Sequence, residues 1–196
     1  MNKQFVIVFL LLIFNRFCFS QVETNAYTFI TWEIAQTANP DAVFAITFEK
    51  NKVSKLPEKL ARYTNLLALE LGKNKLDTLP LFISEFTQLQ YIGFSKNQMD
   101  HFPVFLCKLP LLKSIDASRN NIEKLPNCLS YLQNLEALDL WDTGLRELPH
   151  DFELLAPKLT YLDLRGMTYS PEYIEKWKAL LPNTTFEHEI PCNCVK

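Results

Sequence analysis

Carboxylates that recur along the chain are the residues best suited to binding chemistry. Asp116, Asp139 and Asp163 each follow an apolar residue in a short alternating segment, and Glu70 takes the same place in an earlier segment. On adjacent parallel strands the three Asp side chains would stand about 5 Å apart and repel one another. The cost is only a few tenths of a kcal/mol per pair, so a role in binding a partner and a purely structural role both stay open.

Aromatic residues share the predicted outward face with these carboxylates. Tyr91, Trp141 and Tyr161 are not required by the apolar pattern of the chain, and outward aromatic side chains are enriched at the hot spots of protein interfaces. We therefore predict that this face binds another protein, whose identity the sequence does not give. The predicted binding surface consists of Glu70, Tyr91, Asp116, Asp139, Trp141, Tyr161 and Asp163.

No pattern in the chain matches a known kind of catalytic site. The four glycines form no phosphate-binding loop, and neither GxSxG nor HExxH occurs. His188, Cys192 and Cys194 form an HxxxCxC cluster, but a structural zinc site normally needs four ligands. A disulfide or free thiols are therefore the favoured interpretation, and we predict no enzyme activity, no cofactor and no metal site.

An internal repeat organises most of the chain and positions these residues. Prolines recur every 23 residues, and asparagines follow with the same step. The prolines are Pro57, Pro80, Pro103, Pro126 and Pro149, and the asparagines are Asn51, Asn74, Asn97 and Asn120. Aligned units such as LLALELGKNKLDTLP and LKSIDASRNNIEKLP share one apolar frame, and a degenerate unit, LTYLDLRGMTYSP, follows the last of them.

These units resemble the leucine-rich repeat family in its 23-residue form, LxxLxLxxNxLxxLP, and the chain looks like small secreted bacterial members of it. The resemblance covers residues 43–165, about five and a half turns. It implies an α/β fold: a right-handed, horseshoe-shaped solenoid with a parallel sheet on its concave face and helical caps at both ends. It also implies a non-catalytic module that binds proteins through the concave face.

Each position of the unit has a physical reason. Alternation predicts a strand with one buried face, to which Leu66, Leu69 and Leu71 contribute, and no unit can bury that face without a neighbour. The asparagines are expected to bond to the backbone as a ladder. Thr143 replaces Asn in the fifth unit, and a hydroxyl bonds less than an amide, so we predict a local weakness there. The residues expected to fill the convex side are Leu60, Ile83, Leu106, Leu129 and Phe152.

The front of the solenoid needs a cap. Residues 21–42 are the predicted N-terminal cap, with a short helix over 31–39. Thr31 is its expected N-cap, and Trp32 and Ile34 belong to an apolar stripe, completed by Ala35 and Ala38, that would cover the first turn.

The back of the solenoid needs a cap as well. Residues 166–196 are the predicted C-terminal cap and tail. Ser170 is the expected N-cap of a helix with Pro171 at its first position, and Trp177 is expected to cover the core as part of its apolar stripe.

The first twenty residues predict export. Lys3 precedes an apolar run from Phe5 to Phe14, and small residues follow at the spacing of a cleavage site. We predict a signal peptide over residues 1–20, since a bilayer-spanning anchor needs about 20 apolar residues. The mature protein is then expected in the periplasm, on the cell surface or outside the cell, without a transmembrane anchor.

The net charge bears on the class of partner, and the cysteines bear on possible disulfides. The formal net charge is −2, and it becomes −4 when the loss of Lys3 and Arg16 leaves 18 basic against 22 acidic residues. No basic excess favours nucleic acid as a partner. Cys107 and Cys128 lie on neighbouring return segments in a compartment that tolerates disulfides, but an offset of two positions leaves a bridge and free thiols as equal alternatives.

A basic column runs beside the predicted binding surface. It consists of Lys50, Lys73, Lys96 and Arg119. Such a run meets an acidic partner in some proteins, but it is more often a solvated face, and this is the interpretation that the sequence favours.

An apolar flank is the remaining surface feature. Leu81, Phe82, Val104 and Phe105 stand where other units carry polar residues. Contiguous exposed apolar residues indicate an interface, unless the C-terminal tail covers them. The alternative function is therefore a structural or self-associating envelope component, a homo-oligomer that uses this flank.

Overall fold

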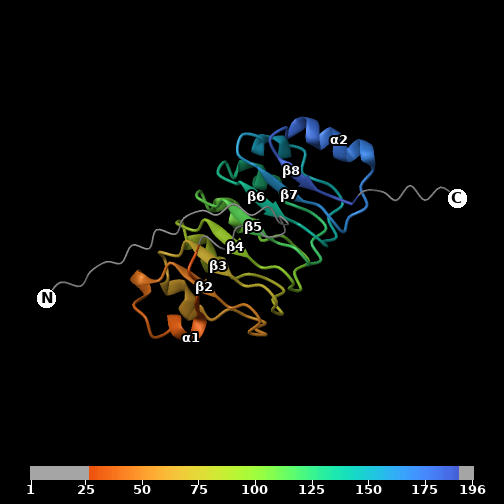
Figure 1. The fold of residues 1–196 in the computed structure, drawn as a ribbon. Coiled ribbons are helices and arrows are strands. Elements are labelled where there is room, and N and C mark those ends of the chain that lie inside the picture. Colours follow the sequence, from red (N-terminus) through yellow and green to blue (C-terminus); the bar gives the residue numbers. More distant parts are fainter. Residues whose placement is uncertain (1–26, 190–196) are drawn as a thin grey trace, which may run out of the picture.

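A single parallel sheet forms one side of the molecule (Figure 1). The computed structural model describes residues 27–189, and within this range eight strands pair in the order of the sequence. The strands are β1 Ile30–Thr31, β2 Ala45–Thr47, β3 Ala68–Glu70, β4 Tyr91–Gly93, β5 Ser114–Asp116, β6 Ala137–Asp139, β7 Tyr161–Asp163 and β8 Thr185–Glu187. The predicted α/β solenoid with a parallel sheet is confirmed.

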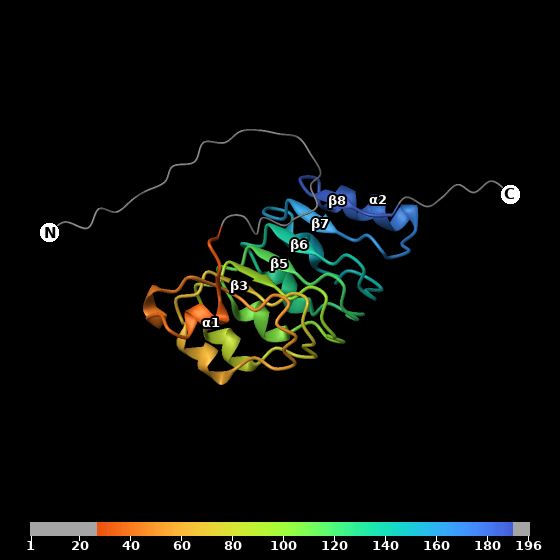
Figure 2. The same ribbon diagram turned by 60° about the horizontal axis from the view of Figure 1, so that its bottom comes forward.

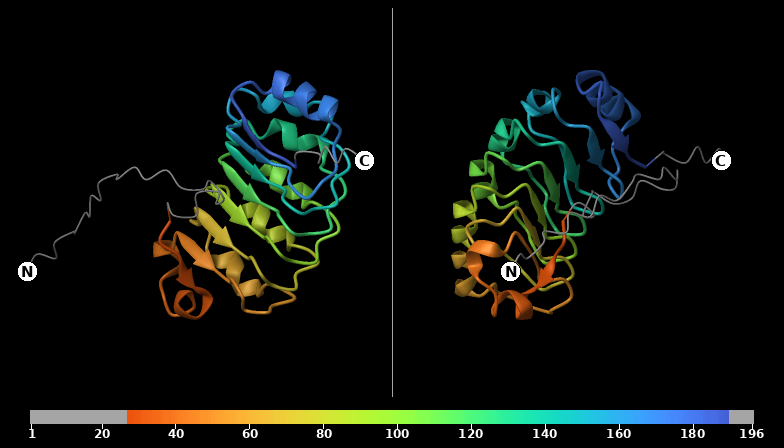
Figure 3. Two further views of the ribbon diagram at one scale, coloured as in Figure 1. Left: turned by 45° about the vertical axis from the view of Figure 1, so that its right-hand side comes forward. Right: turned by 60° about the vertical axis from the view of Figure 1, so that its left-hand side comes forward.

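Short 3₁₀ helices form the opposite, convex side, as both views of Figure 3 show. They are η3 Glu58–Arg62, η4 Leu81–Glu85, η5 Val104–Lys108, η6 Asn127–Tyr131 and η7 Phe152–Leu155. The first four each begin after a repeat proline, whose fixed φ, such as −70° at Pro57, turns the chain out of the preceding segment. The five residues predicted to fill the convex side of the core are all fully buried.

The core runs without interruption between the sheet and these helices. The middle residue of each strand stacks on that of the next, for example Leu69 on Ile92 and Ile92 on Ile115. Leu66, Leu69 and Leu71 point inward as predicted and are inaccessible to solvent. Because the register advances by one whole turn at each strand, every position of the unit forms a column across the sheet.

The asparagine column bonds successive turns together. Asn74 Nδ2 donates to the carbonyls of Phe48, Leu71 and Gly72 at 2.8–3.1 Å, and its Oδ1 accepts from the amide of Val53 at 3.1 Å. Asn97 and Asn120 repeat this pattern. The buried amides are therefore satisfied by their own turn and the preceding one, as the predicted ladder requires.

The ladder is shorter than predicted at its first position and weaker at its last. Asn51 is exposed, because the turn before it is the irregular N-terminal cap and not another repeat. Thr143 is buried, but within residues 27–189 its hydroxyl contacts only the carbonyl of Leu140 at 2.9 Å and the Met167 sulfur at 3.5 Å. The side-chain oxygen of an Asn at this position would accept a hydrogen bond from the backbone amide of Ile122. In the described part of the chain that amide has no backbone acceptor.

The C-terminal cap has the predicted form. Helix α2 spans Pro171–Leu180, and Ser170 Oγ accepts from the Tyr173 amide at 3.2 Å as the N-cap. Trp177 packs edge-on against Phe152 of the last 3₁₀ helix, with ring centroids 5.8 Å apart. Strand β8, which the sequence did not predict, then extends the sheet beyond this helix. The last residues of the predicted tail, 190–196, lie outside the described part.

The N-terminal cap differs from the prediction. Helix α1 spans only Trp32–Ala35, the Thr31 side chain makes no capping bond, and a separate 3₁₀ turn, η2, follows at Pro40–Ala42. Trp32 stacks on Phe48 at 5.1 Å, as expected of a cover for the core, but Ile34 is exposed. The helix begins at Trp32 because Ile30–Thr31 joins the sheet as β1. It is short mainly at its C-terminal end, where Asn39 is extended before Pro40 and a separate turn begins.

Cys107 and Cys128 are joined by a disulfide, with Cα atoms 5.8 Å apart. They belong to η5 and η6, so the bridge joins the convex sides of two adjacent turns. The offset of two positions that left this pairing open in the sequence still brings the Cα atoms within the ordinary range of a disulfide. Cys192 and Cys194 lie outside the described residues, as does the predicted signal peptide.

Thr143→Asn is expected to raise the free energy of unfolding by about 1 kcal/mol, because the amide would supply the missing bonds to the backbone. Urea unfolding followed by circular dichroism measures the change. Thr143→Val keeps the size and removes the hydroxyl, so it should lower the free energy by a similar amount. A Thr143→Asn protein no more stable than the wild type would contradict the ladder account.

Candidate binding groove on the concave face

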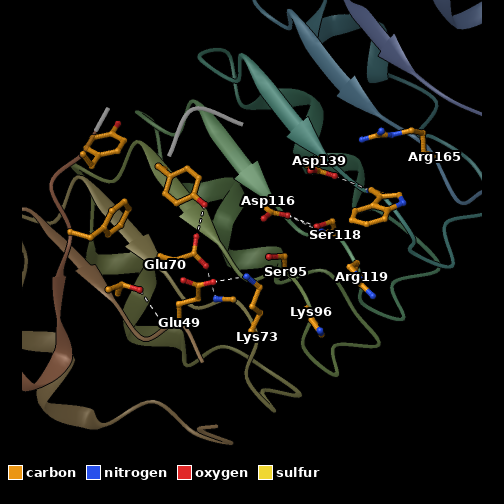
Figure 4. Close-up of a pocket in the computed structure, with 16 residues that line it drawn as sticks. Glu49, Glu70, Lys73, Ser95, Lys96, Asp116, Ser118, Arg119, Asp139 and Arg165 are labelled. Carbon is orange, nitrogen blue, oxygen red and sulfur yellow. Dashed lines mark hydrogen bonds and ion pairs between the residues drawn. The ribbon is translucent and has the colours of Figure 1, made fainter. Parts of the chain in front are cut away.

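A groove of about 640 Å³ crosses the concave face of the sheet (Figure 4). Its floor comes from the strands and its edge from the turns that follow them. Figure 2 shows the strands of this sheet side by side, with the backbone turns that follow them. The lining residues are Tyr27, Phe29, Thr47, Glu49, Glu70, Gly72, Lys73, Tyr91, Ser95, Lys96, Asp116, Ser118, Arg119, Asp139, Trp141 and Arg165. Carboxylates, hydroxyls, cations and aromatic rings thus meet in one depression.

The carboxylates of the floor bind the backbone just after the end of their own strands. Glu70, Asp116, Asp139 and Asp163 each accept a hydrogen bond from the backbone amide two residues later, at 2.6–3.0 Å. Thr47 does the same through its hydroxyl. This bond satisfies an amide that the sheet leaves unpaired, so part of the acidic column has a structural explanation. The strand register stacks Asp116, Asp139 and Asp163 on one another as predicted.

Two of these carboxylates are also satisfied at their second oxygen. Tyr91 donates its hydroxyl to Glu70 Oε2 at 2.6 Å. Gly93 follows Glu70 in the column, and a Cβ there would collide with both the Glu70 carboxylate and the Tyr91 hydroxyl, which explains the glycine in an otherwise polar column. Arg165 Nη2 donates to Asp163 Oδ2 at 2.5 Å, and the Asp163 side chain is inaccessible to solvent.

Asp116 and Asp139 have no ion pair with any residue in the range 27–189. Asp116 accepts from the amide and hydroxyl of Ser118, whereas Asp139, among the residues that the structure describes, accepts only from the Trp141 amide. Burial raises the pKa of both, and the nearby Asp116 charge adds to the effect at Asp139, whose pKa is about 7. Asp139 is therefore a partly protonated carboxyl at neutral pH.

Trp141 is the exposed aromatic residue of the groove, with 39% of its surface accessible. The Arg119 guanidinium lies 5.1 Å from its ring centroid and that of Arg165 lies at 5.8 Å. These are cation–π distances. The two arginines come from the turns before and after Trp141, so three consecutive turns build one basic and aromatic edge.

Tyr91 is on the concave face but is not available to a partner. The N-terminal segment places Tyr27 and Phe29 over it, with ring centroids 6.3 and 6.1 Å away, and only 1% of Tyr91 is exposed. Burial and the Glu70 carboxylate both raise the pKa of its hydroxyl. The alternation of Tyr27, Phe29 and Thr31 was the sequence signal for this covering segment, which leads into β1, and the prediction missed it.

The basic column follows the edge of the groove in a left-handed backbone conformation. Lys50, Lys73, Lys96 and Arg119 have φ between 52° and 61°, which non-glycine residues seldom adopt. The same position is glycine in the last turn, Gly166. Lys73 pairs with Glu49 at 2.7 Å and Arg119 with Asp142 at 3.8 Å, whereas Lys96 has no such pair within the described range.

Comparison with known proteins identifies the architecture. No protein-family model and no curated protein matches the sequence. A leucine-rich repeat protein of Leptospira interrogans matches with a TM-score of 0.64 and 24% identity, over 80% of this chain and 45% of that one. The chain has the leucine-rich repeat fold.

Further solved structures share this leucine-rich repeat fold. The ectodomain of the Arabidopsis thaliana membrane receptor kinase GASSHO1/SCHENGEN3, in complex with Casparian strip integrity factor 2, matches with a TM-score of 0.62 and 21% identity, over 77% of this chain and 18% of that one. TLR13 in its complex with ssRNA13 matches with a TM-score of 0.59 and 23% identity, over 74% of this chain and 21% of that one. The chain spans less than half the length of each of these three proteins.

The leucine-rich repeats gather most of the predicted binding residues into the groove. Glu70, Asp116, Asp139 and Trp141 line it, and Tyr161 lies beside them on the same face, half-buried. The expected exposure of Tyr91 and Asp163 is corrected: Tyr27 and Phe29 cover the first, and Arg165 and the neighbouring strands enclose the second. Prediction missed Arg165, Ser95 and Ser118, which the repeat pattern leaves as variable positions.

Within residues 27–189 the structure offers no group of three side chains that could hold a metal ion. His188 contacts the Glu189 carbonyl at 3.1 Å, and the cysteines proposed beside it lie outside this range. No helix in the same range is long and apolar enough to cross a membrane.

Asp139→Asn is expected to raise the free energy of unfolding at pH 8 by about 1–3 kcal/mol. The folded-state pKa of Asp139, about 7, exceeds the ordinary value. The folded protein therefore holds a proton there that the unfolded chain has released, and stability falls as pH rises from about 4 to 7. Asn keeps the bond to the Trp141 amide and does not titrate.

Urea unfolding at several pH values between 4 and 8 tests this expectation. The wild type should lose more stability across the window than Asp139→Asn does. Parallel curves for the two proteins would show that the Asp139 carboxyl titrates normally. Glu153→Gln, on the convex side, is the matched control.

Proposed function

We propose that this protein is a non-catalytic binding module that recognises another protein through its concave groove. The observation that carries the proposal is the Trp141 edge, where an exposed indole lies between two guanidinium groups. The repeat needs neither an aromatic nor a basic residue at these positions. Trp and Arg are also the residues most enriched at interface hot spots.

The neighbours of known structure support a binding role in general. One was solved with Casparian strip integrity factor 2 and another with ssRNA13, so the fold serves more than one class of ligand. A protein partner fits this groove better than RNA, because Glu70, Asp116 and Asp139 line its floor and the chain carries a net charge of −2. Phosphates would be repelled from that floor.

Export is part of the proposal. It rests on the signal-peptide pattern of residues 1–20 and is compatible with the Cys107–Cys128 disulfide, which an oxidising compartment preserves. The bridge lies on the convex side and leaves the groove open.

Capture of partners from an extract of the source organism tests the proposed function. The wild type is compared with a variant that carries Asp139→Ala, Trp141→Ala and Tyr161→Ala. The matched control carries Leu81→Ser and Val104→Ser on the convex flank. We expect the groove variant to lose its partners by at least about tenfold and the control to keep them. Equal capture by all three proteins would remove the groove as the binding site.

A second candidate function has one observation in its favour. Leu81 and Val104, on adjacent turns of the convex flank, are 67% and 61% exposed, while Phe82 and Phe105 are packed partly into the core. Only half of the predicted flank is thus available as an apolar surface. An envelope component that self-associates would use this surface.

Analytical ultracentrifugation up to millimolar concentration tests the second candidate. Because the leading proposal needs no second copy, we expect a monomer. A dimer that Leu81→Ser and Val104→Ser abolish, with the groove variant still dimeric, would favour self-association instead.

A further inference from the structure

The charges of the groove are divided between its floor and its edge. The floor carries Asp116 and Asp139, and the edge carries Lys96 and Arg119. Each turn runs from floor to edge in three residues, for example from Asp116 through Ser118 to Arg119. Figure 4 shows Asp116 and Asp139 apart from Lys96 and Arg119, whereas Glu49 lies beside Lys73. An occupant with one kind of charge would meet repulsion from either the floor or the edge.

The floor carboxylates Asp116 and Asp139 have no ion pair within residues 27–189. Glu70 has none either, but its second oxygen accepts the Tyr91 hydroxyl. Asp163 is neutralised by Arg165, and Glu49 by Lys73. Asp116 and Asp139 are stacked in register, half-buried, and unpaired with any cation in the described part of the chain. Two adjacent carboxylates in a groove that holds a large ligand can be neutralised from outside by an ammonium or guanidinium group.

At the edge of the groove, basic side chains lack anionic partners. Lys96 is unpaired within residues 27–189, and Arg119 has only an exposed partner 3.8 Å away. Both stand at positive φ, where glycine or asparagine would fold more easily. The fold therefore does not account for basic residues here. A carboxylate of the occupant would bind between these two cations, beside the Trp141 ring.

We propose, on the basis of the binding function proposed above, that the groove takes an extended polypeptide segment that places a Lys or Arg side chain against Asp116 and Asp139 and an Asp or Glu side chain against Lys96 and Arg119. In an extended segment neighbouring side chains point to opposite sides and alternate ones to the same side. A basic and an acidic residue two apart therefore face the groove together. Trp141 packs against the segment between them.

The protonation of Asp139 gives this recognition a pH dependence. The groups that face Asp139 are Asp116 of β5, Tyr161 and Asp163 of β7, Tyr91 of β4 and the Arg165 side chain. As pH rises through about 7 the carboxyl ionises, and a basic side chain of the occupant then binds more tightly. The affinity is expected to increase from pH 6 to pH 8 and to stay nearly constant for Asp139→Asn.

Selection from a displayed library of random 12-residue peptides on the immobilised protein tests the inference. The wild type is expected to enrich peptides with a basic residue two positions from an acidic one. The double variant Asp116→Asn and Asp139→Asn should lose the preference for a basic residue in the peptide. The double variant Lys96→Gln and Arg119→Gln should lose the preference for an acidic residue. The best peptide should bind each variant at least about tenfold more weakly. Leu81→Ser with Val104→Ser is the control, and thermal unfolding confirms that each variant folds.

The outcomes separate this inference from the binding function. Peptides that need Trp141 but carry no charge preference would overturn the inference and leave the groove as a binding site. The same basic preference on the double Asn variant, or no peptide enriched over a blocked surface, would also overturn it. Tight binding of a single-stranded RNA oligonucleotide that needs Lys96 and Arg119 would show that the edge serves a different class of ligand. Capture from the extract decides the binding function independently.

Discussion

The register between successive turns is the constraint on which the structure depends. A 23-residue unit cannot bury its own apolar face, so each strand must pair with the strand one turn away. Equivalent residues then stack as columns, and whatever one turn places at a position is repeated about 5 Å further on. Leucine columns give a continuous core and asparagine columns a hydrogen-bonded ladder. The same stacking aligns the carboxylates and the basic residues, because the backbone does not distinguish side chains that serve folding from those that serve binding.

In the acidic column, the same residues contribute to folding and are available for binding. One oxygen of each carboxylate accepts the amide two residues later, which a serine or threonine could also do, as Thr47 does. The charge of a carboxylate is therefore more than this bond requires. At Glu70 and Asp163 the second oxygen is occupied by a tyrosine or an arginine of the same chain. At Asp139 it accepts no bond within the described residues, and the nearby Arg165 charge offsets only part of the burial that raises the pKa there.

Periodicity predicted the fold because it reports interactions that every turn repeats. Pro57 and its equivalents, the leucine frame and Asn74 all have the roles that spacing assigned to them. Prediction failed where one segment meets the solenoid only once. The cover that Tyr27 and Phe29 place over Tyr91 is a contact across 62 or more residues that no period encodes, and the ends of the sheet at β1 and β8 carry only a short strand pattern. The alternation of the strands predicted which residues of the candidate site lie on the concave face. It could not predict the pairing of Asp163 with Arg165, which depends on side-chain conformation.

The central claim is that partners bind at the Trp141 edge of the concave groove. Hydroxyl-radical footprinting, read by mass spectrometry on the free protein and on the captured complex, tests it most directly. Trp141 and Tyr131 are both exposed in the free protein, at 39% and 62%, and they lie on the concave and convex sides respectively. The account predicts that oxidation of Trp141 falls sharply in the complex while that of Tyr131 is unchanged. Protection of Tyr131 with Trp141 still oxidised at its free rate would contradict it.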